Sequence, residues 1–287
     1  MALEWGRRFL MCAPRFFTVV YQINPWMDAR VPVDPERAWL QWDHLVSTLT
    51  TAGAVVETLP SQPGLPDMVF TANAGIVDGR RFVPAAMKHA ERQAEIPHAR
   101  TWFASRGFEL VELGPDVVQE GAGDALPFAG GLVAGYRPRS SGSAYDQLET
   151  LAGWTVHRLE LADPRYYHVD LVFCPLDERR AMIAPGALTA EGRRLLDELV
   201  PEPLVLEDEE AASFCANSVV VGRTIVMPHC PPRVGRQLQR WGFDVEVVDV
   251  SEFIKAGGAC RCLTLALDVR VASGRTTGPV AAPEPAV

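Results

Sequence analysis

Two cysteines, Cys260 and Cys262, lie two residues apart in a glycine-led segment near the end of the chain, "GGACRCLTLALD" at residues 257–268. A cysteine is strongly nucleophilic without much help, and glycines let a backbone approach a ligand closely. In a strand, this spacing would place both thiols on one face. The commoner role of a cysteine is that of a small apolar side chain in a core. Whether either thiol is reactive or only packs in the core depends on which other reactive residues can reach this segment.

Four other segments interrupt apolar surroundings with polar residues beside glycines or aromatic residues. A buried carboxylate is costly unless it is paired, so these positions are candidates for a site. Asn24 before a proline and Asp67 after "GLP" are also typical of turns, and Glu120 could be a loop carboxylate. The segments are "INPWM" (Asn24), "LPDMVFTANAG" (Asp67, Asn73), "VVQEGAGDAL" (Glu120, Asp124) and "YYHVDLVF" (His168, Asp170).

His168 and Asp170 are two residues apart in a strand-like run, so we expect their side chains to share a face. Such a pair is either a structural hydrogen bond or a general base with the carboxylate that orients it. A zinc site is not predicted for the two cysteines, because no second Cys or His pair supplies the missing ligands. The sequence also lacks a G-x-S-x-G elbow and a phosphate-binding glycine motif. We therefore expect chemistry without a metal or a cofactor.

The composition of the 287 residues excludes several classes of protein. The formal net charge is −9 and no block of Lys and Arg occurs, which argues against a nucleic-acid partner but allows a local pocket for a cationic substrate. The six cysteines are too scattered for a disulfide framework. Arginines interrupt the apolar N-terminus, and no run is long enough to cross a membrane. These features predict a cytoplasmic protein.

A repeated pattern indicates how the elements are organised. Four segments pair an amphipathic helical stretch with a glycine and a short β-branched strand, at Gly53, Gly107, Gly153 and Gly242. A degenerate fifth copy, "LTAEGRRLLDELV" followed by "PEPLVLED", fills the long interval between the last two. Five such units predict a closed, repeated α/β architecture, although a doubly wound sheet also alternates helices with strands. We expect one domain over residues 1–272 and a disordered tail over 273–287.

The motifs "FTANAG", "QEGAGD", "YYHVDLVF" and "CLT", in this order, resemble the guanidine-modifying enzymes of the pentein superfamily. This group includes arginine deiminases, dimethylarginine dimethylaminohydrolases, amidinotransferases and bacterial arginine dihydrolases. The resemblance covers nearly the whole chain and implies a five-bladed α/β propeller with pseudo-fivefold repeats, in agreement with the five units.

The resemblance also implies roles for single residues. Cys262 matches the family nucleophile, His168 the general acid/base, and Glu120 and Asp170 the carboxylates that recognise a guanidinium. Arg139 is similar to the arginine that holds the substrate's α-carboxylate, and Arg92 matches a motif position to which no role is assigned. Cys260 falls at a position that the family does not use for chemistry, which implies packing.

Asn73 departs from the acidic residue common in deiminases and dimethylargininases, and resembles the bacterial arginine dihydrolases, as does Asn24. The expected reaction converts L-arginine to ornithine, ammonia and carbon dioxide through a thiouronium intermediate. The alternatives are a dimethylarginine dimethylaminohydrolase that yields citrulline, an amidinotransferase, a zinc protein, and a non-catalytic propeller that binds a partner. The expected partner is a small guanidine, L-arginine or a methylated arginine, with an oligomer left open.

Overall fold

The computed structural model describes residue 3 and residues 5–271, and its strands form five separate three-stranded sheets. The strands are β1 (Arg8–Met11), β2 (Val55–Thr58), β3 (Gly75–Asp78), β4 (Arg81–Pro84), β5 (Glu109–Leu110), β6 (Ala125–Phe128), β7 (Gly131–Tyr136), β8 (Val156–Glu160), β9 (Phe173–Pro175), β10 (Arg180–Ile183), β11 (Glu202–Val205), β12 (Val219–Val221), β13 (Thr224–Met227), β14 (Asp244–Val247) and β15 (Leu265–Ala266). The sheets are β15–β1–β2, β3–β4–β5, β6–β7–β8, β9–β10–β11 and β12–β13–β14. In each, the middle strand is antiparallel to the first strand named and parallel to the third.

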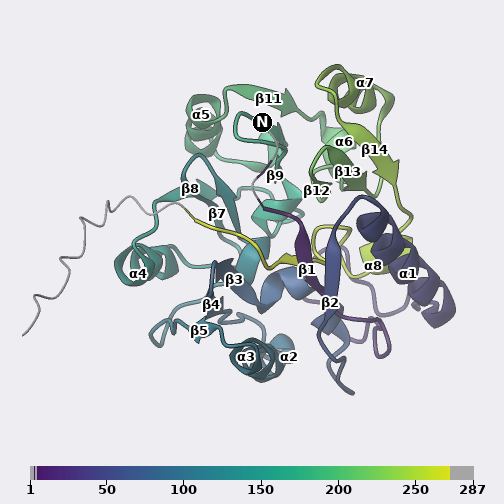
Figure 1. Ribbon diagram of the computed structural model, residues 1–287, viewed down its shortest axis with the longest axis vertical. Coiled ribbons are helices and arrows are strands. Elements are labelled where there is room, and N and C mark those ends of the chain that lie inside the picture. The colour runs from purple at the N-terminus through teal and green to yellow at the C-terminus, as the bar shows by residue number, and fades with distance from the viewer. Residues whose placement is uncertain (1–2, 4, 272–287) are drawn as a thin grey trace, which may run out of the picture.

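A longer helix connects the middle strand to the third strand of every sheet, and these helices lie around the outside of the molecule (Figure 1). They are α1 (Pro35–Thr51), α3 (Ile96–Ser105), α4 (Gly142–Ala152), α5 (Ala190–Leu199) and α7 (Pro232–Arg240). The short helices are η1 (Pro66–Val69), η2 (Thr71–Ala74), α2 (Ala90–Gln93), η3 (Gly121–Gly123), η4 (Val169–Leu171), η5 (Pro185–Ala187), α6 (Asp208–Ala212) and α8 (Ser251–Ile254). The predicted five-bladed α/β propeller is confirmed, and the alternative of one continuous doubly wound sheet is wrong.

The ring of sheets closes through the two ends of the described chain. Strand β15 pairs with β1 in the register Phe9↔Ala266 and Leu10↔Leu265. Beside this pair, the carboxylate of Asp268 accepts the backbone N–H groups of Gly6 at 3.0 Å and Arg7 at 2.7 Å. One sheet therefore combines strands more than 250 residues apart in the chain. This pairing places the segment that precedes β15 beside the segments that precede the first strands of the other sheets.

The helix signals in the sequence act as predicted. Asp34 caps α1 by accepting the N–H groups of Glu36 and Arg37 at 3.0 and 3.1 Å. Gly153 ends α4 in the left-handed conformation, with φ at 71° and its N–H bonded to the Glu149 carbonyl. The other three predicted glycines, at positions 53, 107 and 242, also have positive φ, each two residues after the last residue of its helix.

The expected strand around Cys262 is wrong in its extent. Only Leu265–Ala266 form β15, and residues 257–264 turn before it, so Cys260 and Cys262 do not share one face of a strand. The backbone N–H groups that a strand would pair are bonded instead to the side chain of Asn217. His168 and Asp170 likewise lie at and in the 3₁₀ turn η4, because the strand β9 begins only at Phe173. Alternation over a few residues cannot distinguish a strand from such turns.

No helix among the described residues is long and apolar enough to span a membrane. All six cysteines are free, and five of them are buried. The predicted tail, residues 273–287, lies outside the described residues.

Candidate active site

The short segment before the first strand of each sheet carries the polar residues of the site. Each segment lies in the interior of the molecule, so its side chains meet those from other sheets. These buried residues, none more than 3% exposed, are Asn73 before β3, Glu120 before β6, His168 and Asp170 before β9, Asn217 before β12 and Cys262 before β15. The propeller therefore assembles one polar centre from segments far apart in the chain.

The sulfur of Cys262 contacts two of these residues. Its Sγ lies 3.4 Å from Asp170 Oδ2 and 3.1 Å from Nδ2 of Asn217. The same Asn217 Nδ2 donates to the backbone carbonyl of Asp170 at 3.2 Å. The nucleophile candidate is thus held between a carboxylate and an amide donor.

Burial sets the protonation of this group. Burial is the largest cause of the rise in the pKa of Cys262, and the nearby charge of Asp170 adds to it. Burial also raises the pKa of Asp170 to about 7, against the lowering effects of its bond to Cys262 and of the charge of Arg261. The second carboxylate oxygen of Asp170, Oδ1, is buried without a hydrogen-bond partner. Near neutral pH the pair favours a protonated thiol, and Asp170 titrates in the same range.

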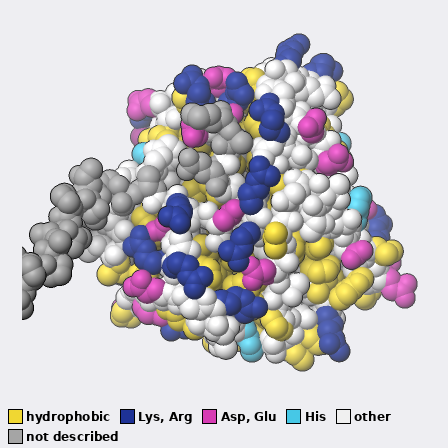
Figure 2. Space-filling view, viewed as in Figure 1, with side chains coloured by type: hydrophobic (Ala, Val, Ile, Leu, Met, Phe, Trp, Pro, Cys, Tyr) yellow, Lys and Arg dark blue, Asp and Glu magenta, His cyan; other side chains and the backbone are white. Residues whose placement is uncertain are grey.

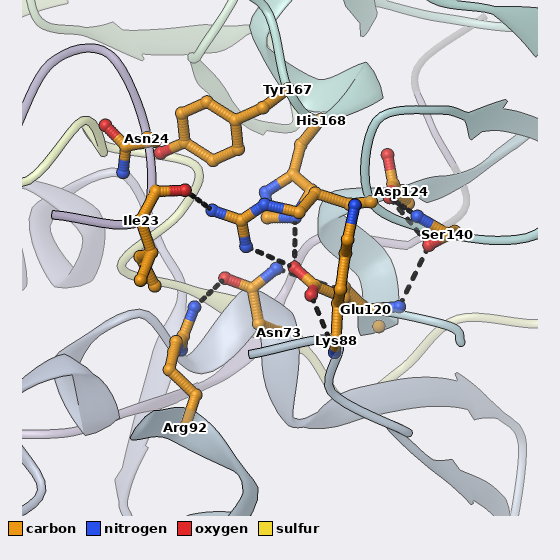
Figure 3. A network of polar contacts seen from close by, with 12 residues as sticks. Ile23, Asn24, Asn73, Lys88, Arg92, Glu120, Asp124, Ser140, Tyr167 and His168 are labelled. Carbon is orange, nitrogen blue, oxygen red and sulfur yellow. Dashed lines mark hydrogen bonds and ion pairs between the residues drawn. The ribbon is translucent and has the colours of Figure 1, made fainter. Parts of the chain in front are cut away.

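A second group is formed by Glu120 and His168 (Figure 3), together with Arg139. Glu120 Oε2 lies 2.7 Å from His168 Nε2 and accepts from Arg139 Nη1 at 2.7 Å. Its other oxygen, Oε1, accepts the backbone N–H of Lys88 at 3.1 Å. Burial acts to raise the pKa of Glu120, but the bond to His168 and the charges of His168 and Arg139 outweigh it and lower that pKa well below its usual range. Glu120 is therefore a carboxylate that holds the imidazole.

Asn73 uses both ends of its amide (Figure 3). Its Nδ2 donates to the Glu120 carbonyl at 2.8 Å, and its Oδ1 accepts from Arg92 Nη1 at 2.9 Å. Arg92 is itself fixed by two bonds of 2.9 Å to the carboxylate of Glu95. These bonds orient Asn73. They also indicate the role of Arg92 that the sequence left unassigned: Arg92 is a buried cation that positions the Asn73 side chain.

Asp67 lies on the other side of Arg92, with 3.9 Å between Arg92 Nε and Asp67 Oδ2. Its Oδ1 is buried and makes no hydrogen bond of ordinary geometry. Burial raises the pKa of Asp67, opposed by the charge of Arg92 and by the Tyr21 hydroxyl, which is close enough to lower that pKa. An unsatisfied buried oxygen of this kind is suited to a cationic or N–H-rich ligand.

A small cavity adjoins both groups. Cys262 and Asn73 both line it. Glu120, His168 and Asp170 are not among the lining residues, but Glu120 contacts the lining residue Arg139, Asp170 contacts Cys262, and His168 contacts Glu120. Arg139 covers part of the cavity wall, where its guanidinium lies 4.8 Å above the Tyr167 ring and donates to the Ile23 carbonyl at 2.8 Å. The lining residues are Ile23, Asn24, Asp67, Phe70, Asn73, Arg92, Arg139, Tyr167, Ala256, Gly258 and Cys262.

Asn24 has both of the roles considered from the sequence, that of a turn residue and that of a site residue. Its Oδ1 accepts the Trp26 N–H at 2.9 Å, which is the turn role, and its Nδ2 donates to the Ala256 carbonyl at 3.0 Å. It also lines the cavity, so a ligand there would touch it. Cys260 is fully buried and is not among the lining residues, in agreement with packing.

The structure brings the nine sequence-predicted site residues around one cavity, with one correction. His168 and Asp170 are not a pair: His168 bonds to Glu120 and Asp170 to Cys262, because the 3₁₀ turn points their side chains apart. Within the described residues, no group of three or more His, Cys, Asp or Glu is placed to hold a metal ion.

Sequence reasoning missed Asn217, although the chain contains a signal for it. "FCAN" at residues 214–217 repeats "FTAN" at 70–73, and each asparagine stands two residues before the first strand of its sheet. Comparing the repeats with one another would have marked Asn217 as the counterpart of Asn73.

Comparison with known proteins gives several relatives. The chain is 39% identical over 263 residues to the bifunctional arginine dihydrolase/ornithine cyclodeaminase ArgZ of Synechocystis sp., covering 90% of this chain and 37% of ArgZ. It is 37% identical over 259 residues to an N(G),N(G)-dimethylarginine dimethylaminohydrolase of Mycobacterium tuberculosis, covering 90% of this chain and 85% of that enzyme. No protein-family model matches the chain.

Solved structures agree with these relatives. The N-terminal domain of ArgZ, an arginine dihydrolase from cyanobacteria with product bound, superposes with a TM-score of 0.88 at 38% identity, covering 91% of this chain and 97% of that domain. A dimethylarginine dimethylaminohydrolase variant superposes with a TM-score of 0.76 at 18% identity, which shows the shared fold. This chain therefore belongs to the guanidine-modifying enzymes of the pentein superfamily.

Proposed function

We propose that this chain hydrolyses L-arginine at its guanidinium carbon through a covalent intermediate on Cys262, and that it does so twice to give ornithine. The observation that carries the proposal is that Cys262 and the amide of Asn73 face the same cavity. The similarity to the arginine dihydrolase domain of ArgZ supports it. Because the chain spans only 37% of ArgZ, the proposal concerns the dihydrolase reaction alone.

Two charged groups at the cavity suit the amino-acid end of arginine. The free Oδ1 of Asp67 is an acceptor for the α-ammonium group. Arg139 bonds to Glu120 and to the Ile23 carbonyl through one N–H of each terminal nitrogen, and its remaining N–H groups are donors for the α-carboxylate. The guanidinium end then extends toward Asn73 and Cys262 in the same cavity.

The first hydrolysis begins with a positive charge beside a neutral thiol. A bound guanidinium offsets the burial and the Asp170 charge that disfavour the thiolate, and Asp170 at 3.4 Å takes the thiol proton. The thiolate attacks the guanidinium carbon, a C–S bond forms, and the C–N bond to a terminal nitrogen breaks. His168, held by Glu120, gives that nitrogen a proton, so ammonia leaves.

Water then attacks the thiouronium carbon, giving up a proton to His168, and the C–S bond breaks. In a second round the thiolate attacks the ureido carbon, and the C–N bond to the remaining terminal nitrogen breaks to release the second ammonia. Water then displaces the sulfur, and the resulting carbamate loses carbon dioxide as its C–N bond to the ornithine nitrogen breaks. In total, arginine and two waters give ornithine, two ammonia and one carbon dioxide. Asn73 suits both rounds, since an amide donates and accepts, whereas a carboxylate only accepts.

The test is product analysis with arginine carrying ¹³C in the guanidino carbon. We expect the ¹³C label to appear in carbon dioxide and the remaining carbon atoms of arginine to appear in ornithine. The Cys262→Ser variant, assayed in parallel, should be inactive. Citrulline as the sole end product would remove the second round. Absence of arginine turnover by the wild type would overturn the proposal.

A second candidate is hydrolysis of N-methylated arginine to citrulline, which the similarity to the mycobacterial enzyme favours. The same assay decides between them when arginine, monomethylarginine and asymmetric dimethylarginine are compared by kcat/KM. An amine acceptor added to parallel reactions reveals an amidinotransferase, because such an enzyme would turn over only in its presence.

A further inference from the structure

Asn217 is fully buried and directs its whole amide at the turn that carries Cys262. Its Oδ1 accepts the backbone N–H groups of residues 259, 261 and 262 at 3.1, 3.1 and 3.2 Å. Its Nδ2 donates to Cys262 Sγ at 3.1 Å and to the Asp170 carbonyl at 3.2 Å. Both ends of the amide are thus satisfied, and one of them touches the sulfur itself.

The surroundings of that sulfur otherwise oppose a negative charge. Cys262 is buried, and its nearest acidic group, Asp170, is only 3.4 Å away. Among the described side chains, that of Asn217 is the one that donates a hydrogen bond to Sγ. A hydrogen bond to a thiolate is stronger than one to a thiol, because the acceptor is charged. The contact therefore favours the form of Cys262 that attacks.

The two asparagines of the repeated sequence differ in what their side chains contact. Asn73 and Asn217 end the sequences "FTAN" and "FCAN" and stand at the same distance before β3 and β12. Asn73 lines the cavity, whereas Asn217 does not and lies behind Cys262. Matching positions of the repeated sequence thus place one amide toward the substrate cavity and the other toward the nucleophile.

We infer that Asn217 is a catalytic residue for the reaction at Cys262: its Nδ2 stabilises the thiolate, and its Oδ1 holds the turn that presents the sulfur. The inference rests on the proposed role of Cys262 as nucleophile. Because Asn217 does not line the cavity, its removal should lower kcat and leave KM for arginine nearly unchanged.

The test compares Asn217→Asp, Asn217→Ala and the control Ser218→Ala. Asp keeps the oxygen that accepts the three N–H groups and loses the donor to sulfur. Ser218 is the neighbouring buried residue, and its Oγ bonds to the Cys215 carbonyl at 2.7 Å, away from Cys262. Circular dichroism and the melting temperature check folding; should the alanine variant unfold, the aspartate variant carries the test.

The substrate-independent measurement is the rate of Cys262 alkylation by iodoacetamide from pH 6 to 10, followed by peptide mass mapping. Mapping is needed because Cys230 is a free, half-buried thiol that is also accessible to the reagent. Loss of a hydrogen bond to a charged acceptor should lower kcat about 10- to 100-fold and move the alkylation profile of Cys262 about one to two pH units higher. Ser218→Ala should match the wild type in kcat and in the pH profile of Cys262 alkylation.

The inference is overturned if Asn217→Asp alkylates at Cys262 with the wild-type pH profile. A fall in kcat with that profile unchanged also overturns it, because it shows a merely structural role. The alkylation profile needs no turnover, so it reports on Asn217 even if arginine proves not to be the substrate, which would overturn the proposed function separately.

Discussion

Replacement of Asn73 by aspartate would test the two-step reaction most directly. The change keeps the size and shape of the side chain but removes the Nδ2 donor. In the structure that donor lies 2.8 Å from the Glu120 carbonyl, so the variant would place two acceptors against each other. On the other side, the bond from Arg92 at 2.9 Å would become an ion pair. The side chain should therefore stay in place while its chemistry changes.

The magnitude follows from these contacts. Leaving the Glu120 carbonyl without its donor costs about 1–3 kcal/mol, and the charge-assisted bond to Arg92 offsets part of this. The variant should thus fold with a modestly lowered melting temperature. In the second round, the ureido oxygen loses a donor as it gains negative charge, which at about 1.5–3 kcal/mol slows that round roughly 10- to 100-fold.

The assay follows citrulline and ornithine by mass spectrometry after arginine is added to each variant. Asn73→Asp should accumulate citrulline, whereas the wild type forms ornithine. Asn24→Asp makes the same amide-to-acid change in the same cavity, at a side chain bonded to the backbone of Trp26 and Ala256. It should alter KM and leave the product ratio unchanged. An unchanged ornithine-to-citrulline ratio in Asn73→Asp would refute the role of the amide.

Three other substitutions test substrate binding, the protonation of Asp170 and the anchoring of the chain after β15. Asp67→Asn should raise KM for arginine about 10-fold or more with a smaller effect on kcat, because the α-ammonium group of the substrate loses a charged partner. Steady-state kinetics measure both constants, and an unchanged KM would contradict the assignment of Asp67 to the α-ammonium group. Since burial raises the pKa of Asp170 to about 7, the folded state binds a proton that the unfolded state releases between about pH 4 and 7, and stability falls as pH rises through this window. Asp170→Asn should reduce the part of that fall that lies between pH 5 and pH 8, by roughly 3 kcal/mol at most, in urea titrations at these two pH values. An equal loss of stability between the two pH values in the variant and the wild type would contradict this prediction. Asp78→Ala removes an acceptor of the Trp154 indole and of the Val271 N–H, both at 3.0 Å, and should lower the free energy of unfolding by about 2–4 kcal/mol. Removing the exposed carboxylate of Asp146 should change the free energy of unfolding by less than about 1 kcal/mol, and equal effects of the two substitutions would argue against the structural role of Asp78.

The repeated architecture could be predicted because helix ends are local. Asp34 with Pro35 starts a helix, and Gly153 ends one, through contacts with residues within four positions in the chain. Repetition of these signals indicated five units and the confirmed propeller. The resemblance to known enzymes then identified the residues around the cavity, since motifs in order carry information that single residues lack.

The partners of those residues could not be predicted in the same way. Period-two spacing suggested that His168 and Asp170 share a strand face, but a 3₁₀ turn sends one to Glu120 and the other to Cys262. Asn217 was missed because its importance lies in bonds to a turn more than 40 residues away. Those bonds exist only after the sheets are arranged around the centre.

The sequence by itself determined the number of units, the ends of the helices and the kinds of reactive side chain, because these depend on neighbours along the chain. The tertiary structure decided which of those side chains meet. Closure of the ring by β15 and β1 places Cys262 beside Asp170 and Asn217, and the buried position of that centre sets the protonation of its acids and its thiol. Burial and distance between remote segments are properties of the folded chain, and no local pattern encodes them.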